Sequence, residues 1–271
     1  MSTRSLLVAR LGLAIAAAGA VGACATAPSP EEKAIAEALQ SKQILPATRE
    51  ERDAADQKDL LSQAAFWGQE YDKNPNDYEA ALKLSRVLRQ IGSSSRAAEI
   101  SAQALNLRQG DVDLTLVFAQ ASLDTGQPEA AVGPLARIEG NVMENWRAQS
   151  IIGVTLDQLG KHQEAQAYYE RALAISPDNP QVLSNLALSH ALEGDAAKAE
   201  DLLRTAATAP GADVRVRQNL ALVLGVQGKF TEATEAAGAD LPRAMVEANI
   251  AYFRKLLTPA RSYDRLRGTQ D

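Results

Sequence analysis

The sequence predicts an all-α solenoid of about five helix-turn-helix units, each 34 residues long, with further helices flanking the array at both ends. Two observations support this fold class. Small and apolar residues recur at intervals of 34 residues, and the chain of 271 residues is rich in alanine while only 4% of its residues are aromatic. An interior of small side chains favours closely packed helices over a sandwich or a barrel.

The repeat period is defined by two columns of small residues. The glycine column contains Gly92, Gly126, Gly160, Gly194 and Gly228. The alanine column follows five residues later and contains Ala97, Ala131, Ala165, Ala199 and Ala233. A glycine can adopt the left-handed conformation that ends a first helix, and an alanine lets a second helix approach the first closely. Each unit is therefore predicted to be a helical hairpin.

The unit from Trp146 to Asn179 carries the most complete motif. Its defining residues are Ile152, Gly153, Leu156, Gly160, Ala165, Tyr169, Ala172 and Pro177. This pattern resembles the tetratricopeptide repeat (TPR), whose members usually bind peptide segments in a groove lined by their first helices. Other units depart from the motif, most visibly at Pro134, which lies inside a predicted second helix.

We expect an array over residues 58–240, with units near 78–111, 112–145, 146–179, 180–213 and 214–240. Before the first full unit, the segment ending at Pro75 is predicted to be a lone second helix. Its Trp67 and Tyr71 would cover the N-terminal end of the core.

The C-terminal end of the array is also predicted to be covered. A capping helix is expected over residues 241–258, with an apolar stripe of Met245, Ile250, Phe253 and Leu257. Residues 259–271 are expected to form a loose tail.

The N-terminal segment has the pattern of a processing signal. Residues 1–23 combine two arginines with a short apolar run, which is typical of a secretory signal peptide. The stretch Val21-Gly22-Ala23-Cys24 resembles the bacterial lipobox, and Cys24 is the single cysteine of the chain. The resemblance implies removal of residues 1–23 and acylation of Cys24, for example with palmitate. A plain signal peptide followed by a chance cysteine is the alternative.

If Cys24 is acylated, the protein is a lipoprotein anchored to a membrane. By analogy with enterobacterial sorting, Ala25 favours the outer membrane, with the protein facing the periplasm. The segment 24–57 is rich in proline and then in charged residues, so we expect a flexible tether.

The composition argues against several function classes. The formal net charge of −6 disfavours general nucleic-acid binding, which needs a surplus of Lys and Arg. A single cysteine excludes an internal disulfide framework, and two histidines leave little for a metal site. No nucleophile motif, phosphate-binding loop or metalloprotease motif is present. The sequence therefore predicts no enzyme, no cofactor, no metal and no small-molecule substrate.

Counting from the motif predicts which polar residues line the partner-binding groove. They are Arg86, Arg89, Arg147, Gln181, Asn185, Arg215 and Asn219. The two asparagines are one period apart and can hydrogen-bond the backbone of a partner, and Arg147 and Arg215 can bind carboxylates. An acidic protein segment is therefore the expected ligand, although each residue taken singly is also compatible with a solvated helix face.

The stretch from Arg217 to Leu257 resembles the TPR lipoprotein of tight-adherence (Flp) pilus assembly systems. The resemblance rests on Arg217-Gln218-Asn219-Leu220-Ala221, on the turn Gly228-Lys229-Phe230 and on Ala248-Asn249-Ile250-Ala251-Tyr252. It implies a pilotin-like adaptor that helps an outer-membrane secretin to localise or assemble. The alternative is a TPR scaffold or regulator of cell-envelope enzymes such as peptidoglycan synthases. A third class, a periplasmic hydrolase, lacks a clustered nucleophile and base.

Overall fold

The computed structural model describes residues 29–30, 45–238 and 240–257. The signal segment, Cys24, most of the tether and the tail at 259–271 lie outside these residues. The chain divides into two compact units, Met1–Pro46 and Ala47–Asp271, and the helices named below belong to the second.

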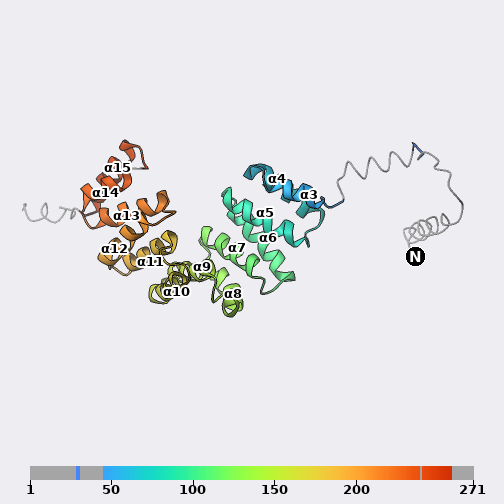
Figure 1. The fold of residues 1–271 in the computed structure, drawn as a ribbon, viewed down its shortest axis with the longest axis horizontal. Helices are drawn as coiled ribbons and strands as arrows, with labels where there is room; N and C mark the ends of the chain where they lie inside the picture. The colour runs from blue at the N-terminus through green and yellow to red at the C-terminus, as the bar shows by residue number, and fades with distance from the viewer. Residues whose placement is uncertain (1–28, 31–44, 239, 258–271) are drawn as a thin grey trace, which may run out of the picture. The chain divides into compact units, whose positions relative to one another are not determined.

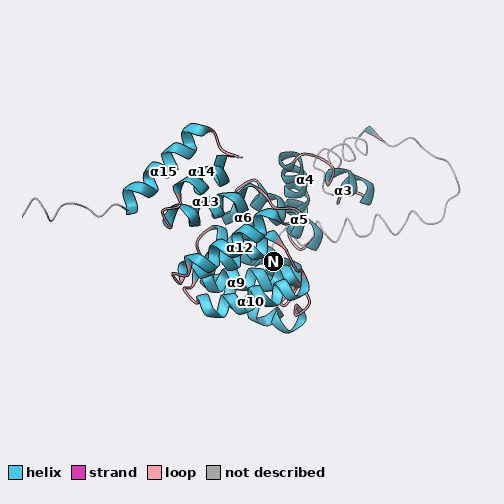
Figure 2. Ribbon diagram, turned by 60° about the vertical axis from the view of Figure 1, so that its left-hand side comes forward, coloured by secondary structure: helices cyan, strands magenta, loops and turns pink. Residues whose placement is uncertain are grey.

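Helices account for the regular structure of the described residues, and Figure 2 shows no strand among them. In chain order they are α3 (Arg49–Ala55), α4 (Leu60–Lys73), α5 (Tyr78–Gln90), α6 (Ser94–Leu107), α7 (Val112–Asp124), α8 (Pro128–Ile138), the 3-10 turn η1 (Glu139–Asn141), α9 (Trp146–Gln158), α10 (His162–Ile175), α11 (Pro180–Leu192), α12 (Ala196–Thr208), α13 (Val214–Val226), α14 (Phe230–Gly238) and α15 (Arg243–Leu257).

The helices repeat with the predicted period. The first helices α5, α7, α9, α11 and α13 begin 34 residues apart, and so do the second helices α4, α6, α8, α10, α12 and α14. Each helix packs against the next in the chain, and the first helices of adjacent pairs also contact one another. Figure 1 shows this succession from α3 to α15. The first helices therefore lie side by side.

Both ends of the first helices are specified locally. Their N-caps are Asp77, Asp111, Asn145, Asn179 and Asp213, and each side chain accepts a hydrogen bond from a backbone N–H of the first turn. At the other end, the five glycines of the period all have φ between 69° and 94°. This confirms the predicted role of the glycines, since other residues adopt these angles at a cost.

The repeated alanines lie where the two helices of a pair meet. Ala97, Ala131, Ala165, Ala199 and Ala233 are all completely buried. At the N-terminal end, α4 is the predicted lone second helix, and its Trp67 and Tyr71 are buried as expected.

The expected tether is wrong for its last residues, because Arg49–Ala55 form helix α3. Thr48 caps this helix in a reciprocal capping box with Glu51. Arg52 holds the helix in place through ion pairs to Glu70, at 3.0 Å, and to Asp77, at 2.5 Å. The two arginines of this segment, Arg49 and Arg52, are thus paired with carboxylates of α4 and of the start of α5.

The C-terminal helix α15 covers α13 and α14, as predicted, but with a different stripe. Val246 and Ile250 are buried, and the ring of Phe253 lies against Gly225 of α13. Met245 is 52% exposed and Leu257 is 47% exposed, so these two do not belong to the buried stripe. The inward face of the helix is therefore formed by positions 246 and 250, which are buried, and 253, which is partly buried, rather than by 245, 250, 253 and 257.

The irregular second helix is α8. It contains Pro134, spans 11 residues where α6 and α10 span 14, and is followed by the turn η1. Proline removes one backbone donor from the helix and restricts the preceding residue. The array keeps its period here because the linker from Glu139 to Asn145 makes up the missing length.

Candidate partner-binding groove

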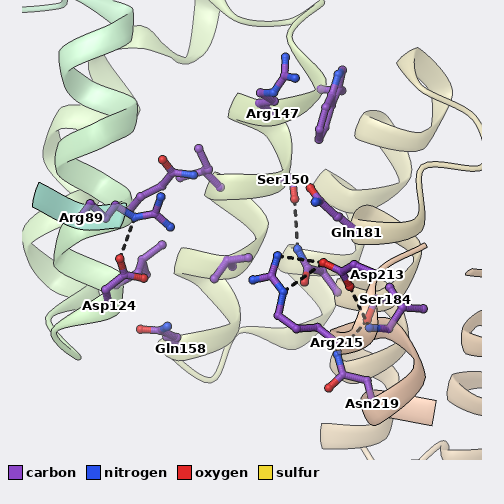
Figure 3. A pocket seen from close by; sticks show the side chains of 17 residues that line it. Arg89, Asp124, Arg147, Ser150, Gln158, Gln181, Ser184, Asp213, Arg215 and Asn219 are labelled. Atoms are coloured by element: carbon purple, nitrogen blue, oxygen red, sulfur yellow. Dashed lines mark hydrogen bonds and ion pairs between the residues drawn. The ribbon is translucent and has the colours of Figure 1, made fainter. Parts of the chain in front are cut away.

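A groove of about 480 Å³ runs across the first helices α5, α7, α9, α11 and α13. Figure 3 shows its side chains from close by. The lining residues are Arg89, Gln120, Leu123, Asp124, Trp146, Arg147, Ser150, Ile151, Val154, Gln158, Gln181, Ser184, Asn185, Asp213, Arg215, Val216 and Asn219.

The groove brings together six of the seven residues that the motif selects. The exception is Arg86, which does not line it. The guanidinium of Arg86 forms an ion pair of 2.6 Å with Asp113, on the neighbouring first helix. Arg86 therefore lies outside the groove that the other six residues line.

Two of the arginines in the groove also have acidic neighbours. Arg89 Nε lies 2.7 Å from an Asp124 carboxylate oxygen, although without the geometry of a hydrogen bond. Arg215 binds Asp213 at 3.2 Å. Burial works to raise the pKa of Asp213, but hydrogen bonds from the Val216 N–H and from Arg215 outweigh it and keep this pKa below its usual value.

Arg147 is different from these two arginines. Its guanidinium carbon lies 4.5 Å from the centroid of the Trp146 ring, a cation–π arrangement, and it forms no ion pair with any residue that the structure describes. With Arg89 and Arg215 compensated by Asp124 and Asp213, Arg147 leaves the groove with one uncompensated positive charge.

The two asparagines are held by serines of the preceding repeat. Asn185 Nδ2 donates to Ser150 Oγ at 3.3 Å, and Asn219 Nδ2 donates to Ser184 Oγ at 2.9 Å. These bonds join neighbouring first helices, so the asparagines are partly structural. Each Oδ1 atom accepts no hydrogen bond within the described chain and remains able to accept one from a ligand.

Comparison with known proteins identifies the repeat. The sequence profile of the tetratricopeptide repeat matches residues 116–180 and 152–214, which extend from α7 to α13. These residues are similar to tetratricopeptide repeats. The fold of the chain is accordingly a TPR solenoid, and TPR folds are typically non-catalytic scaffolds for protein interactions.

Solved structures share this architecture, and a curated protein is similar to part of the sequence. TTC0263, a thermophilic TPR protein of Thermus thermophilus, is 21% identical, with 61% of this chain and 90% of that chain covered and a TM-score of 0.53. MamA AMB-1 is 22% identical, with 57% of this chain and 92% of that chain covered and a TM-score of 0.50. Protein y4yS of Sinorhizobium fredii (strain NBRC 101917 / NGR234) is 31% identical over 119 residues, which are 44% of this chain and 64% of the relative.

Sequence reasoning missed several groove residues of this solenoid. Trp146, Ser150, Ser184 and Asp213 were not selected, although all of them lie in the groove. The two serines could have been predicted from the repeat period. Ser150 and Ser184 are 34 residues apart, and each precedes a groove position by one residue. The stacking of Arg147 on its neighbour Trp146 depends on side-chain geometry, which the period does not show.

One cluster of ionisable side chains outside the groove, around Asp157, serves the packing of the repeats. Asp157 accepts hydrogen bonds from Tyr169 Oη at 2.8 Å and from Ser189 Oγ at 2.7 Å, and lies 2.9 Å from His162 Nδ1. No group of three metal-ligating side chains occurs in the described segments. None of the helices in these segments is both long and apolar enough to cross a membrane.

Proposed function

We propose that this TPR protein is an adaptor that binds an acidic, extended segment of a protein partner in the groove. The observation that carries the proposal is Arg147, whose guanidinium rests on the Trp146 ring without a carboxylate partner among the described residues. A carboxylate from a ligand would supply the missing counter-charge. Because the Trp146 ring already restricts the arginine side chain, less conformational entropy is lost when the ligand binds.

The asparagines suit an extended ligand. The Oδ1 atoms of Asn185 and Asn219 repeat with the solenoid, and backbone N–H groups of a peptide can donate to them. The Ser150 and Ser184 hydroxyls fix the two amides, so little side-chain entropy is lost when a peptide binds. Backbone contacts would supply affinity and Arg147 would supply the preference for an acidic segment.

We further propose that Cys24 carries lipid and anchors the adaptor at the outer membrane, facing the periplasm, in tight-adherence pilus assembly. The support is the lipobox-like stretch before Cys24 and the resemblance of residues 217–257 to the TPR lipoprotein of that system. In this role the groove binds a segment of the secretin or of another assembly component, and lipid chains hold the complex at the membrane.

The experiment compares detergent-resistant secretin multimers in outer membranes of strains that express wild type, no protein, Cys24→Ala or Arg147→Ala. Arg96→Ala is the matched control, since Arg96 is an exposed arginine of α6 that pairs only with Glu99 among the described residues and does not line the groove. We expect multimers to be lost in the deletion strain, mislocalised with Cys24→Ala, reduced with Arg147→Ala and normal with Arg96→Ala. Unchanged multimers in all strains would exclude the secretin role and favour a cell-envelope scaffold.

A further inference from the structure

A second cleft, of about 230 Å³, lies between the second helices α6 and α8 and shares no residue with the groove. Its lining residues are Ala102, Leu105, Asn106, Gln109, Gly110, Thr115, Phe118, Ala130, Pro134 and Arg137. The small side chains of Ala102 and Ala130 and the short helix α8 leave this space unfilled.

The cleft contains a buried hydroxyl without a partner. Thr115, on α7, is 1% exposed, lines the cleft and makes no hydrogen bond through Oγ1 within the described residues. Leaving a hydroxyl buried and unpaired costs about 1–3 kcal/mol. A residue that carries this cost within a cleft is a candidate ligand contact.

The equivalent positions of the other repeats carry no unpaired hydroxyl, although Gln149 Oε1 is also buried without a partner among the described residues. One period earlier stands Ala81 and two periods later Leu183, both apolar and buried. Gln149 donates its amide to the Val142 carbonyl, and Arg217 binds Asp240. Thr115 alone among these five places an unpaired hydroxyl in an open cleft.

Three further donors line the same cleft. The guanidinium of Arg137 and the amides of Asn106 and Gln109 make no hydrogen bond or ion pair in the part of the chain that the structure describes. Leu105, Phe118 and Pro134 supply apolar wall. The cleft thus combines N–H and O–H donors, one of them cationic, with a small apolar surface.

We propose that this cleft binds a carboxylate carried on a small apolar body. An ionised carboxylate only accepts hydrogen bonds, and it can accept them from the Thr115 hydroxyl, the amides and the Arg137 guanidinium. The volume equals that of about seven or eight water molecules, enough for one leucine-sized residue with its carboxylate. The C-terminal residue of a protein chain and a free small organic acid share this chemistry.

The test uses defined probes. N-acetyl-leucine represents the free acid and the peptide Gly-Gly-Gly-Leu represents a chain terminus, each paired with its C-terminal amide. Chemical-shift changes in the NMR spectrum at Thr115, Phe118 and Arg137 locate binding, and titration gives the affinity. We expect both acids to bind in the cleft and the amides to bind at least about tenfold more weakly. Tighter binding of the peptide assigns the site to chain termini, and tighter binding of N-acetyl-leucine assigns it to free acids.

Variants separate this site from packing and from the groove. Thr115→Val keeps the side-chain volume and Arg137→Gln removes the charge, and each should weaken acid binding about tenfold. Acid binding in the cleft should be unchanged in two controls, Arg96→Gln on α6 and Arg147→Ala in the groove. Because Arg147→Ala removes the groove's charge, failure of the cleft proposal can be told apart from failure of the proposed function. The proposal would be overturned by any of three results. Neither acid changes the chemical shifts of the cleft residues, the amides bind as tightly as the acids, or Thr115→Val binds the acids with wild-type affinity. A Thr115→Val variant with a raised Tm, together with no acid bound by wild type, would show that the hydroxyl is unpaired without serving a ligand and would also overturn the proposal.

Discussion

The ring of Tyr169 occupies the space where a side chain at Gly153 would begin. A Cβ atom at position 153 would lie 2.5 Å from Tyr169 Cε1, closer than any relaxed contact. The Tyr169 hydroxyl donates to Asp157, one turn beyond Gly153 on α9, at 2.8 Å. Burial raises the pKa of Tyr169, with the charge of Asp157 adding to the effect, so the hydroxyl stays protonated as a donor. The glycine and this hydrogen bond together set the spacing of α9 and α10.

Gly153→Ala is expected to destabilise the protein by about 1–3 kcal/mol, because the buried ring must move to admit the methyl group. Gly68→Ala on α4 is the matched control, since no atom lies within 4 Å of a Cβ built there. The control should gain about 0.5–1 kcal/mol from helix propensity. Urea unfolding of both variants measures the difference. Equal stability of the two would mean that the contact with Tyr169 is not strained by a methyl group.

Gly225→Ala should loosen α15. A Cβ at position 225 would clash with Phe253 Cδ2, so the ring that anchors α15 to α13 would be displaced. We expect faster amide hydrogen exchange over residues 243–257, corresponding to a loss of about 1–3 kcal/mol of local stability. Met245→Ala is the control, because Met245 is 52% exposed and should leave exchange unchanged. Unchanged exchange in Gly225→Ala would show that α15 is not held by this contact.

The carboxylate of Glu200 should stabilise the fold in a pH-dependent way. A hydrogen bond from Lys229, with others from Arg204 and Gln227, lowers its pKa from 4.5 to about 2. Because the folded pKa is the lower one, the stabilisation is complete above pH 4.5 and is lost as pH falls toward 2. It amounts to at most about 3 kcal/mol, reduced by salt because Lys229 and Arg204 are partly exposed.

Glu200→Gln measures this contribution. Its deficit in free energy of unfolding relative to wild type should be largest near neutral pH and should shrink between pH 4.5 and pH 2. Denaturant titrations at a series of pH values provide the comparison, with Glu164→Gln as an exposed control that pairs only with Lys161 among the described residues. A deficit that does not change with pH would mean that Glu200 acts through packing rather than charge.

Arg52→Met should release α3 from the solenoid. The Glu70 side chain is 2% exposed and binds both Arg52 and Lys73, so removal of Arg52 leaves a buried carboxylate with a single counter-charge. We expect a loss of about 2–4 kcal/mol, seen as rapid hydrogen exchange over residues 49–55. Arg49→Met, whose side chain is 73% exposed, should cost less than about 1 kcal/mol. Protection of α3 in Arg52→Met would show that its capping box suffices.

The predictable part of the fold is the part encoded within one period. The hairpin of α9 and α10 depends on contacts within itself, made by Gly160, Ala165 and Tyr169. The spacing of these residues therefore predicts the hairpin. Helix α3 could not be predicted in this way, because Arg52 finds its partners 18 and 25 residues away, in α4 and before α5. A charged segment has the same composition whether its charges are paired or solvated.

In the groove, too, the features set by the repeat period could be predicted and those set by individual side-chain contacts could not. The period places Arg147, Gln181 and Arg215 on one face because they are 34 residues apart. The loss of Arg86 to Asp113 is a pairwise side-chain contact, and the cleft at Thr115 depends on the shortening of α8. Neither is visible in a column of the repeat.

Site-specific photo-crosslinking in intact cells tests most directly whether the groove binds an acidic segment. A photo-reactive amino acid replaces Gln181, an exposed residue of the groove, or Glu170, an exposed residue of α10 outside it. We predict a crosslink from position 181 to an acidic segment of one envelope protein, its loss when Arg147→Ala is added, and no such product from position 170. Equal products from both positions, or a product from 181 that survives Arg147→Ala unchanged, would contradict binding of an acidic segment in the groove.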